Sequence, residues 1–480
     1  MDGWGMKTEC DLSGTTWRIL LIKSNYNAPV HLSVVPPLGL MCLAAYLREH
    51  YRYQVKIEDL RLSGNNAEFL ETAIRDYAPD VVGISALSFE TDAIAWIAER
   101  VKHVNKNTTV LLGGPHSTSY PEMSARIPGI DYVVVGEGEI ATGRLIERLF
   151  QGGDVSGLTG LAYLRGDQVI TTGRAEYIEE LDSLPMPAYD LIPLDRTGIY
   201  TRITRTGAGK FMTLFTSRGC PYQCVYCHNV FGKKFRFRSA KSLIHEIRYL
   251  YDTYGIRDYE IVDDIFNLDR ERLVEFCDRV TQSGMKLNLV FPIGMRGDIL
   301  DEFQLSKLKH AGTIFLAFAI ETGSLRMQKL LKKNIQLDKI KQNIEIAHKL
   351  RIHPHGFFMI GLPDETLEDM KMTVKFMLSS KLHTCLLFVT MPFEGTELGR
   401  MAREMGPGPV SDFSMSYHTK NFINLTRVST RIVNLIRYCA IMLFYLNPIR
   451  LFFFFRDFPR KRELPTIIML FFQRLRWRTS

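Results

Sequence analysis

The run SRGCPYQCVYCHN spans residues 217–229 and carries Cys220, Cys224 and Cys227 at C-x3-C-x2-C spacing. Three thiolates on one short loop can bind three irons of a cubane iron–sulfur cluster, and the fourth iron is then open to an exchangeable ligand. A structural cluster normally takes four cysteines, so a ligand-binding cluster is favoured. The alternative is zinc bound by the three cysteines and His228, which is disfavoured because adjacent Cys227 and His228 would chelate a metal poorly.

Strands and helices alternate on the carboxyl side of this run. Residues 211–215 predict a first strand that leads directly into the cysteine loop, and the alternation continues with about six βα units. This pattern predicts a partial (β/α)6 TIM-type barrel. Active sites of such barrels lie at the carboxyl ends of the strands, so the later strand ends should face the cysteines.

Those later strand ends are unusually polar. They carry Asp263 and Asp264, then Arg296, then Glu321, and finally the segment 356–366, GFFMIGLPDET. Two adjacent carboxylates after a buried strand suit a cationic or hydroxyl-rich ligand. Each position also has a structural alternative: Asp264 could cap a helix, Arg296 could form a surface ion pair, and Glu321 could lie at a helix N-terminus.

A second α/β pattern precedes the barrel. Strands are predicted at residues 17–23, 54–59, 80–85, 109–113 and 131–136, with helices such as 38–49 between them. This is the pattern of a doubly wound, Rossmann-like parallel sheet, which binds ligands at the carboxyl ends of its strands. Neither G-x-G-x-x-G after the first strand nor a phosphate-binding G-x-x-x-x-G-K-S/T is present, so a nucleotide site is disfavoured.

Length and cysteine usage indicate a multi-domain protein of a reducing compartment. The 480 residues, 46% of them hydrophobic, suffice for two or three cores. No signal-peptide pattern precedes the first predicted strand, so we expect a cytoplasmic protein. The five cysteines outside the loop are isolated, which is typical of buried thiols and not of a disulfide framework; they are Cys10, Cys42, Cys277, Cys385 and Cys439.

The net charge of +8 is concentrated at the carboxyl end. Residues 421–480 contain eleven Lys and Arg against Asp457 and Glu463, so the rest of the chain is close to neutral. A globally basic nucleic-acid-binding protein is therefore disfavoured, and no nucleic-acid partner is expected.

The basic residues at the end are mixed with aromatic clusters. No uncharged stretch approaches the ~20 residues that a membrane-spanning helix needs. One hypothesis is a peripheral, basic amphipathic surface resting on anionic lipid, in which Arg456, Arg460, Lys461 and Arg462 take part. The alternative is a set of helices that pack their aromatic side chains against the barrel and turn their arginines to solvent.

The cysteine run resembles the signature of radical S-adenosylmethionine (SAM) enzymes, including the aromatic Tyr226 just before the third cysteine. In that family the open iron of a [4Fe-4S] cluster chelates SAM, and an electron from the cluster cleaves SAM to a 5′-deoxyadenosyl radical. The resemblance implies a reductant such as flavodoxin or ferredoxin.

The same resemblance gives the strand ends expected roles. Asp263 and Asp264 stand where the SAM ammonium is held, and Arg296 is a candidate partner for the SAM carboxylate. Glu321 lies in a run similar to the family's Glu-Ser/Thr-Gly-Ser motif, and Ile360 and Gly361 lie where adenine is cradled.

The first domain resembles the cobalamin-binding domain that precedes the barrel in some radical SAM enzymes. The resemblance rests on four segments at expected strand ends, and it implies cobalamin contacts from Pro37, Ser85, Leu87, Gly113, Gly114, His116, Gly136 and Glu137. Many cobalamin proteins carry Asp-x-His-x-x-Gly, whose His binds cobalt, but the loop 23–29 lacks His and residues 59–64 have Arg at that place. We therefore expect no protein His on cobalt, with His31 the remaining alternative.

These patterns divide the chain into four parts. They are a cobalamin-binding domain at 17–150, a proline-stiffened linker at 151–205, a radical SAM core at 206–410 and a basic aromatic helical extension at 411–480. The extension resembles that of cobalamin-dependent radical SAM enzymes that act on tetrapyrroles, hopanoids and similar apolar molecules. His116, His228, His353 and His355 remain open as acid or base groups.

The resemblance implies a cobalamin-dependent enzyme that methylates an unactivated carbon of a small apolar, lipid-like or tetrapyrrole substrate. One alternative is a cyclase or rearrangement enzyme of the same architecture without net methyl transfer. An alternative of another class is a non-catalytic cobalamin or redox sensor, for which the cysteine triplet would be superfluous.

Overall fold

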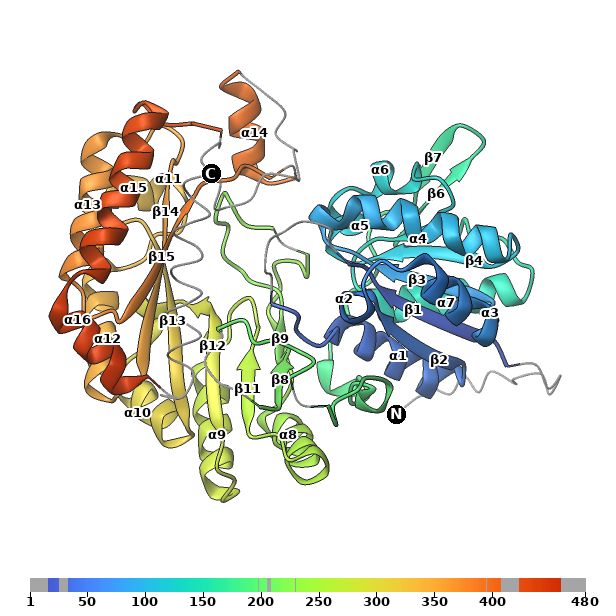
Figure 1. Ribbon diagram of the computed structural model, residues 1–480, viewed down its shortest axis with the longest axis horizontal. Coiled ribbons are helices and arrows are strands. Elements are labelled where there is room, and N and C mark those ends of the chain that lie inside the picture. Colours follow the sequence, from blue (N-terminus) through green and yellow to red (C-terminus); the bar gives the residue numbers. More distant parts are fainter. Residues whose placement is uncertain are drawn as a thin grey trace, which may run out of the picture.

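The computed structural model describes residues 16–25, 33–196, 198–204, 209–228, 230–393, 395–406 and 423–458. Two α/β bodies lie side by side, and the segment that carries the cysteine loop lies between them (Figure 1). His31, Arg460, Lys461 and Arg462 lie outside the described residues, so the hypotheses that name them stay predictions.

The first body contains a seven-stranded sheet in the order β2-β1-β3-β4-β5-β6-β7. Its first five strands are parallel, which confirms the doubly wound pattern. The strands are β1 (Arg18–Lys23), β2 (Gln54–Asp59), β3 (Val81–Ser85), β4 (Thr109–Gly113), β5 (Tyr132–Val134), β6 (Leu161–Arg165) and β7 (Gln168–Thr171).

Both faces of this sheet are covered, because successive side chains of a strand point to opposite faces. Ile19 and Leu21 pack into one core with helices α1 and α7, whereas Leu20 and Ile22 pack into another with α3 and α4. The helices of this body are α1 (Leu38–Tyr51), α2 (Leu60–Ser63), α3 (Ala67–Tyr77), α4 (Thr91–Val104), α5 (Pro115–Ser119), α6 (Pro121–Ala125) and α7 (Gly138–Phe150).

The first sheet extends past residue 150, where the sequence predicted a linker to begin. Strand β6 pairs antiparallel with β5 at Val133 and Ala162, and β7 pairs antiparallel with β6. The free edge of the short strand β5 accepts this hairpin, so the hairpin belongs structurally to the first sheet. The linker proper then runs along the first body, where the Ala188 N–H donates to the Met41 carbonyl at 3.1 Å.

The second body is a six-stranded, all-parallel sheet in the order β8-β11-β12-β13-β14-β15. Within the described residues no pairing closes β15 onto β8, so the predicted partial barrel is confirmed as an open one. Its strands are β8 (Phe211–Leu214), β11 (Asp258–Ile261), β12 (Asn288–Met295), β13 (Thr313–Glu321), β14 (His353–Ile360) and β15 (Thr384–Val389).

Helices follow most of these strands, as a right-handed βα arrangement requires. A small antiparallel pair, β9 (Ser217–Arg218) and β10 (Arg236–Phe237), brackets the cysteine loop. The helices of the barrel are α8 (Ala240–Tyr254), α9 (Arg270–Gln282), α10 (Glu302–His310), α11 (Leu325–Leu330), α12 (Leu337–Lys349), α13 (Leu367–Ser379) and α14 (Glu397–Glu404).

Two further helices, α15 (Thr430–Tyr445) and α16 (Pro448–Asp457), lie against the outer side of the barrel (Figure 1). The described residues contain no single helix long and apolar enough to cross a membrane; α15 and α16 reach that length and composition only as a pair, bent by 64°.

Candidate functional site

The cysteine loop is closed at its base by the β9–β10 pair, in which Arg218 lies opposite Arg236. Gly219 begins the loop with φ +85°, a left-handed conformation that favours glycine. A Cβ at this position would lie 2.2 Å from the Lys234 carbonyl oxygen. The loop therefore needs glycine immediately before Cys220, whose N–H donates to the Gly232 carbonyl at 3.3 Å.

The middle of the loop is anchored to the barrel. The Val225 N–H donates to the Leu331 carbonyl at 3.1 Å, and the Val225 carbonyl accepts from the Leu398 N–H at 2.8 Å. Tyr226 accepts a hydrogen bond from Lys333 at 3.1 Å, and Lys333 also forms a buried ion pair with Glu321 at 2.8 Å. Glu321 thus supports the aromatic residue of the cysteine motif through Lys333.

The loop thiols are partly enclosed and close to one another. Burial raises the pKa of Cys227 to about 12, and the negative charges of Asp264, Cys224 and Cys220 add to this rise. Three neighbouring thiols are held as thiolates only where a cation offsets their mutual repulsion. Iron is such a cation, so the donor set fits a three-cysteine cluster.

Asp263 and Asp264 have separate roles. The buried Asp263 accepts from the Thr216 N–H and the Ser217 hydroxyl, both at 2.6 Å, and so fixes the strand end that enters the loop. Asp264 lies beside the thiols, where burial and the charge of Asp263 raise its pKa to about 6 while the Gly219 N–H lowers it. Of the two, Asp264 is placed to meet a cationic ligand.

Arg296 is already paired. Its guanidinium lies 3.8 Å from the ring centroid of Tyr222 in the cysteine loop and donates to Asp298 at 3.0 Å. The cation–π contact links the end of β12 to the loop. A direct bond from Arg296 to a ligand carboxylate remains a prediction, because it would share the guanidinium with Asp298.

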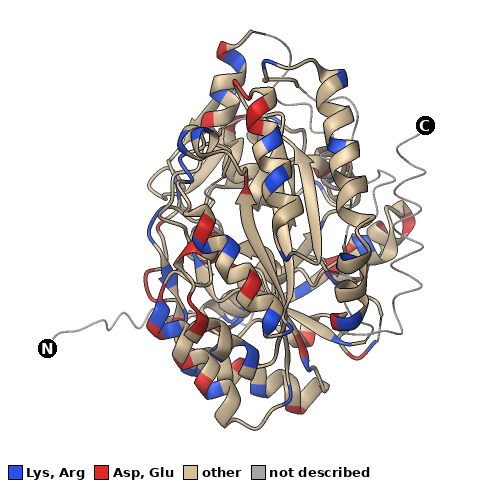
Figure 2. Ribbon diagram, turned by 90° about the vertical axis from the view of Figure 1, so that its left-hand side faces the viewer, with Lys and Arg blue, Asp and Glu red and all other residues tan. Residues whose placement is uncertain are grey.

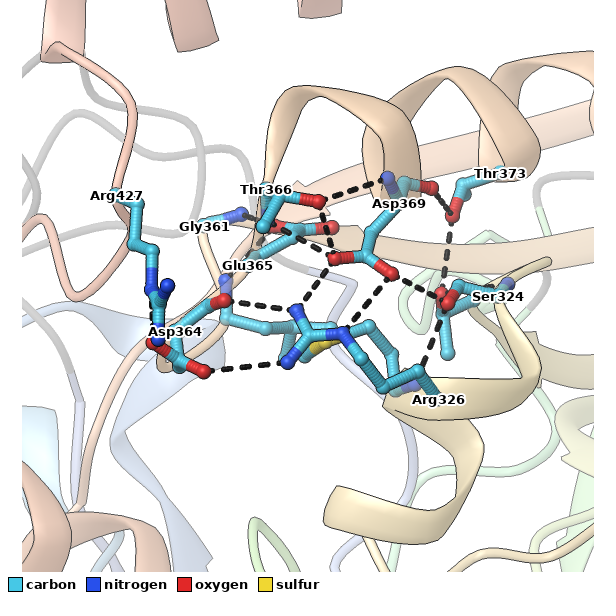
Figure 3. Close-up of polar contacts among 12 residues, drawn as sticks. Ser324, Arg326, Gly361, Asp364, Glu365, Thr366, Asp369, Thr373 and Arg427 are labelled. Atoms are coloured by element: carbon cyan, nitrogen blue, oxygen red, sulfur yellow. Dashed lines mark hydrogen bonds and ion pairs between the residues drawn. The ribbon is translucent and has the colours of Figure 1, made fainter.

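The end of β14 turns at Gly361, with φ +90°, and is held by Glu365. The Glu365 carboxylate accepts from the N–H groups of Gly361 at 2.7 Å and Leu362 at 3.0 Å (Figure 3). Its other oxygen, Oε1, is buried without a hydrogen-bond partner among the described residues. A polar ligand bound beside Ile360 and Gly361 would give this buried oxygen a hydrogen-bond donor.

Next to this turn, Figure 3 shows a network centred on Arg326 and Asp369. Asp369 accepts from the Ser324 hydroxyl at 2.6 Å and also pairs with Arg326. Arg326 in turn pairs with Asp364 at 3.2 Å. Because Ser324 follows β13 and Asp364 follows β14, the network ties two neighbouring strand ends together.

Glu365→Gln is expected to flatten the pH dependence of stability. Burial raises the folded-state pKa of Glu365 from 4.5 to about 7. The wild-type protein therefore loses free energy of unfolding as pH rises through this window, by up to about 1.4 kcal/mol per pH unit. Glutamine does not titrate, so urea midpoints measured at the two ends of the window should differ less in the variant. Glu368→Gln, an exposed carboxyl on α13, should keep the wild-type slope; a wild-type slope in Glu365→Gln would contradict the assignment.

On the first body, the structure brings Ser85, Gly114 and His116 together at the carboxyl ends of β3 and β4. A Cβ on Gly114 would lie 3.1 Å from the Ser85 hydroxyl oxygen, and the His116 N–H donates to the Ala86 carbonyl at 3.3 Å. Burial lowers the pKa of His116 to about 4, so its ring is neutral. Gly113 has open space where a Cβ would be.

The remaining residues expected at the cobalamin site occupy the same edge of the sheet. Leu87 follows β3 and its N–H donates to Glu90 at 2.7 Å. Pro37 directly precedes α1, and Gly136 follows β5 with φ +105°. Their contact with cobalamin remains a prediction.

Glu137 does not point to an open ligand site. It pairs with Arg218 at 2.8 Å and Arg236 at 2.5 Å, and Glu139 pairs with Arg218 at 2.5 Å. All four side chains are buried, so we name them the interdomain ion cluster. The Glu137 carboxylate is thus occupied in joining the first body to the cysteine loop, and a contact of Glu137 with cobalamin remains a prediction.

A pocket of about 360 Å³ lies between the two bodies. One wall contains Thr118 and Ser119 of α5, the helix that follows Gly113 and Gly114. The other wall contains Cys224, Cys227 and His228 of the cysteine loop. The strand ends of the first domain thus face the cysteines across one cavity.

Of the four candidate histidines, His353 and His355 lie away from this pocket. His353 begins β14, whose carboxyl end at Ile360 is about 20 Å further along the strand. Both rings bond to the Thr384 hydroxyl, at 2.9 and 2.7 Å. They therefore belong to the amino end of the barrel.

An open parallel barrel with a three-cysteine loop at its carboxyl edge, facing the strand ends of a doubly wound domain, defines a radical SAM enzyme with a second cofactor domain. The family models agree: "B12 binding domain" matches residues 30–146 and "Radical SAM superfamily" matches residues 214–377. The chain belongs to the cobalamin-binding radical SAM enzymes, whose cofactors are a [4Fe-4S] cluster, SAM and cobalamin.

Relatives cover most of the chain. An uncharacterized methyltransferase of Pyrococcus horikoshii is 33% identical over 76% of this chain and 78% of its own length. Cytidylyl-2-hydroxyethylphosphonate methyltransferase of Streptomyces wedmorensis is 29% identical, covering 77% and 78%. Anaerobic magnesium-protoporphyrin IX monomethyl ester cyclase of Rubrivivax gelatinosus is 28% identical, covering 75% and 65%.

A solved structure shares the fold. The radical SAM methyltransferase TsrM of Kitasatospora setae, with cobalamin and a [4Fe-4S] cluster bound, superposes with a TM-score of 0.68 at 18% identity. The match covers 81% of this chain and 75% of TsrM.

Proposed function

We propose that this enzyme is a C-methyltransferase that acts on an unactivated carbon of a small, apolar substrate. The observation that carries the proposal is the pocket between Thr118 and Ser119 on one side and Cys224 and Cys227 on the other. A methyl donor held by the first body and a radical generated at the cysteine loop would reach the same substrate there.

The residues of the chain hold and orient the reactants. Cys220, Cys224 and Cys227 would bind three irons, and Asp264 would hold the SAM ammonium. Glu365 shapes the turn at Gly361 that would receive adenine. When bound, the cluster supplies the electron that cleaves SAM, and cobalamin supplies the methyl group. The interdomain ion cluster holds the two bodies in register across the pocket.

The finer assignments of partners are proposals of the same kind. We propose flavodoxin or ferredoxin as the reductant, an apolar, lipid-like or tetrapyrrole substrate, and a cytoplasmic location with peripheral membrane contact. The similarity to a protoporphyrin ester cyclase supports a tetrapyrrole as one candidate among apolar substrates.

A half-reaction tests the methyl-transfer proposal without knowledge of the acceptor. The full chain is reconstituted anaerobically with iron, sulfide and hydroxocobalamin, then given SAM and a reductant. We expect S-adenosylhomocysteine to appear in about one equivalent per enzyme, because cobalamin itself accepts the first methyl group. Enzyme loaded with the cluster but without cobalamin is the control and should release none.

The second candidate is a cyclase or rearrangement enzyme, favoured by the similarity to the cyclase of Rubrivivax gelatinosus. That reading predicts 5′-deoxyadenosine and methionine without S-adenosylhomocysteine. Absence of all three products from fully loaded enzyme would contradict both catalytic proposals and favour a sensor.

A further inference from the structure

The helices α15 and α16 each bury one arginine against the barrel. Val433, Arg437, Ala440 and Phe444 form the buried stripe of α15, so one of the four inward positions is an arginine. The buried residue of α16 is also an arginine, Arg450. Arg437 and Arg450 therefore depart from the packing hypothesis in which arginines face solvent, whereas the buried Phe444 and the exposed Arg431 agree with it.

The buried arginines bind carbonyl groups of the barrel. Arg450 donates to the Leu378 carbonyl at 3.0 Å and the Ser380 carbonyl at 3.3 Å, at the C-terminal end of α13, where carbonyl groups lack partners within the helix. Its guanidinium also lies 3.7 Å from the ring centroid of Phe444. Arg437 donates to the Leu387 carbonyl of β15 at 3.2 Å. Two positive charges are thus used to fix the helix pair.

The outward side of the same helices is apolar. Six large side chains at helical spacing are each between 53 and 65% exposed; they are Leu435, Tyr438, Leu443, Leu446, Ile449 and Phe452. We name these six residues the outer apolar face. Exposed apolar side chains gathered on neighbouring helices are typical of an interaction surface.

A groove between α13 and α15 continues the outer apolar face. It has a volume of about 670 Å³ and is lined mainly by apolar side chains, among them Leu367, Val374 and Ile436. Lys371 and Lys375 lie along it. Surfaces that combine apolar side chains with flanking lysines are typical of proteins that insert into the headgroup region of a bilayer.

Charge distinguishes the occupants that could cover this face. Residues 423–458 contain five arginines, of which Arg437 and Arg450 are buried, and a single acidic residue, Asp457; the sequence that follows contains Arg460, Lys461 and Arg462. Figure 2 faces this side of the molecule, where the C-terminal helices carry long uncharged stretches and mainly blue charged bands. A second copy of the chain would bring like charges together, whereas anionic headgroups complement them.

We propose that α15 and α16 form a docking surface for an anionic lipid bilayer, with both helices lying in the interfacial plane. The outer apolar face enters the boundary between headgroups and acyl chains, and the basic residues contact the phosphates. This inference concerns the outer side of the barrel and is independent of the proposed reaction.

Flotation with lipid vesicles tests the proposal on the full chain. We expect wild-type protein to float with vesicles of phosphatidylcholine and phosphatidylglycerol. It should bind phosphatidylcholine alone more weakly, because that lipid carries no net negative charge to attract the basic residues. The double variant Leu446→Glu with Phe452→Glu should bind the anionic vesicles about ten-fold less or weaker. Met123→Glu, which places one carboxylate on an exposed apolar position of α6 away from this face, should bind like the wild type.

Two outcomes would overturn the proposal. One is vesicle binding that is absent in the wild type or unchanged in the double variant. The other is a concentration-dependent dimer in sedimentation equilibrium that the double variant dissociates, which would assign the face to a second copy. An unchanged circular dichroism spectrum of the double variant in vesicle-free buffer shows that it is folded, so the outcome does not depend on the proposed reaction.

Discussion

Cys224→Ala is expected to abolish both cluster assembly and SAM cleavage. The loop supplies three thiolates and lines a pocket with Cys224 and Cys227, so removal of one leaves two ligands for a cluster that needs three. After anaerobic reconstitution, the iron and sulfide contents should fall from about four per chain to background, and no 5′-deoxyadenosine should form. Circular dichroism should stay unchanged, because Cys224 is only partly buried.

Two control variants sharpen this result. Cys439→Ala removes one exposed thiol from α15 and should keep the wild-type iron content. His228→Ala separates the cluster from zinc: a zinc site needs His228 as its fourth ligand, whereas a three-cysteine cluster does not. Iron and sulfide retained by Cys224→Ala, or stoichiometric zinc lost with His228→Ala, would contradict the assignment.

The sequence predicted the secondary structure of both bodies because their strands are short apolar runs between strong turn signals. The strand expected at 109–113 is β4 as observed, and the helix expected at 38–49 is α1 with two more residues. The attachment of the β6–β7 hairpin to β5 was not predicted. Antiparallel edge pairing depends on which edge is free in three dimensions, and local patterns do not record this.

The sequence predicted which segments form the candidate site, but it did not predict the ion pairs between them. Residue types and spacing identified the cysteine loop, and strand ends identified Asp264 and Gly361. They could not show that Glu137 lies against Arg218, because the two residues are 81 positions apart and meet only when the bodies dock. The available signal was Arg218 itself, a charge placed two residues before Cys220 in a buried loop.

For the C-terminal helices, the sequence did not predict which side chains face the barrel. Composition offered two arrangements of the arginine and aromatic residues, and neither of them included a buried arginine. Arg450 can be buried because carbonyl groups at the end of α13 accept its hydrogen bonds in place of water.

Arg218→Met is expected to destabilise the protein and to loosen the contact between its two bodies. The variant leaves Glu139 buried without its main partner, since Glu137 keeps Arg236. Breaking a buried ion pair by removing one partner costs about 3 to 5 kcal/mol. The matched control is Arg48→Met, which breaks an ion pair with Asp190 of the linker whose side chains are about half exposed, and should cost less than about 1 kcal/mol.

The pH dependence identifies the cause of the loss. Arg218 opposes the effect of burial and lowers the pKa of Glu139 below 4.5. In the wild type, this pair therefore stabilises the folded state above pH 4.5 and loses that contribution as pH falls through the lowered pKa. In Arg218→Met the buried Glu139 takes up a proton more readily, so the deficit in urea midpoint should be larger at neutral pH than near pH 4.5.

A double variant completes the argument. Arg218→Met with Glu139→Gln removes both charges and should recover part of the stability, because no unpaired carboxylate remains buried. If Arg218→Met costs no more than Arg48→Met, or if Glu139→Gln worsens it, the ion cluster does not hold the cysteine loop against the first body. Recovery of stability without recovery of S-adenosylhomocysteine release would show that the position of the loop, and not only its folding, depends on Arg218.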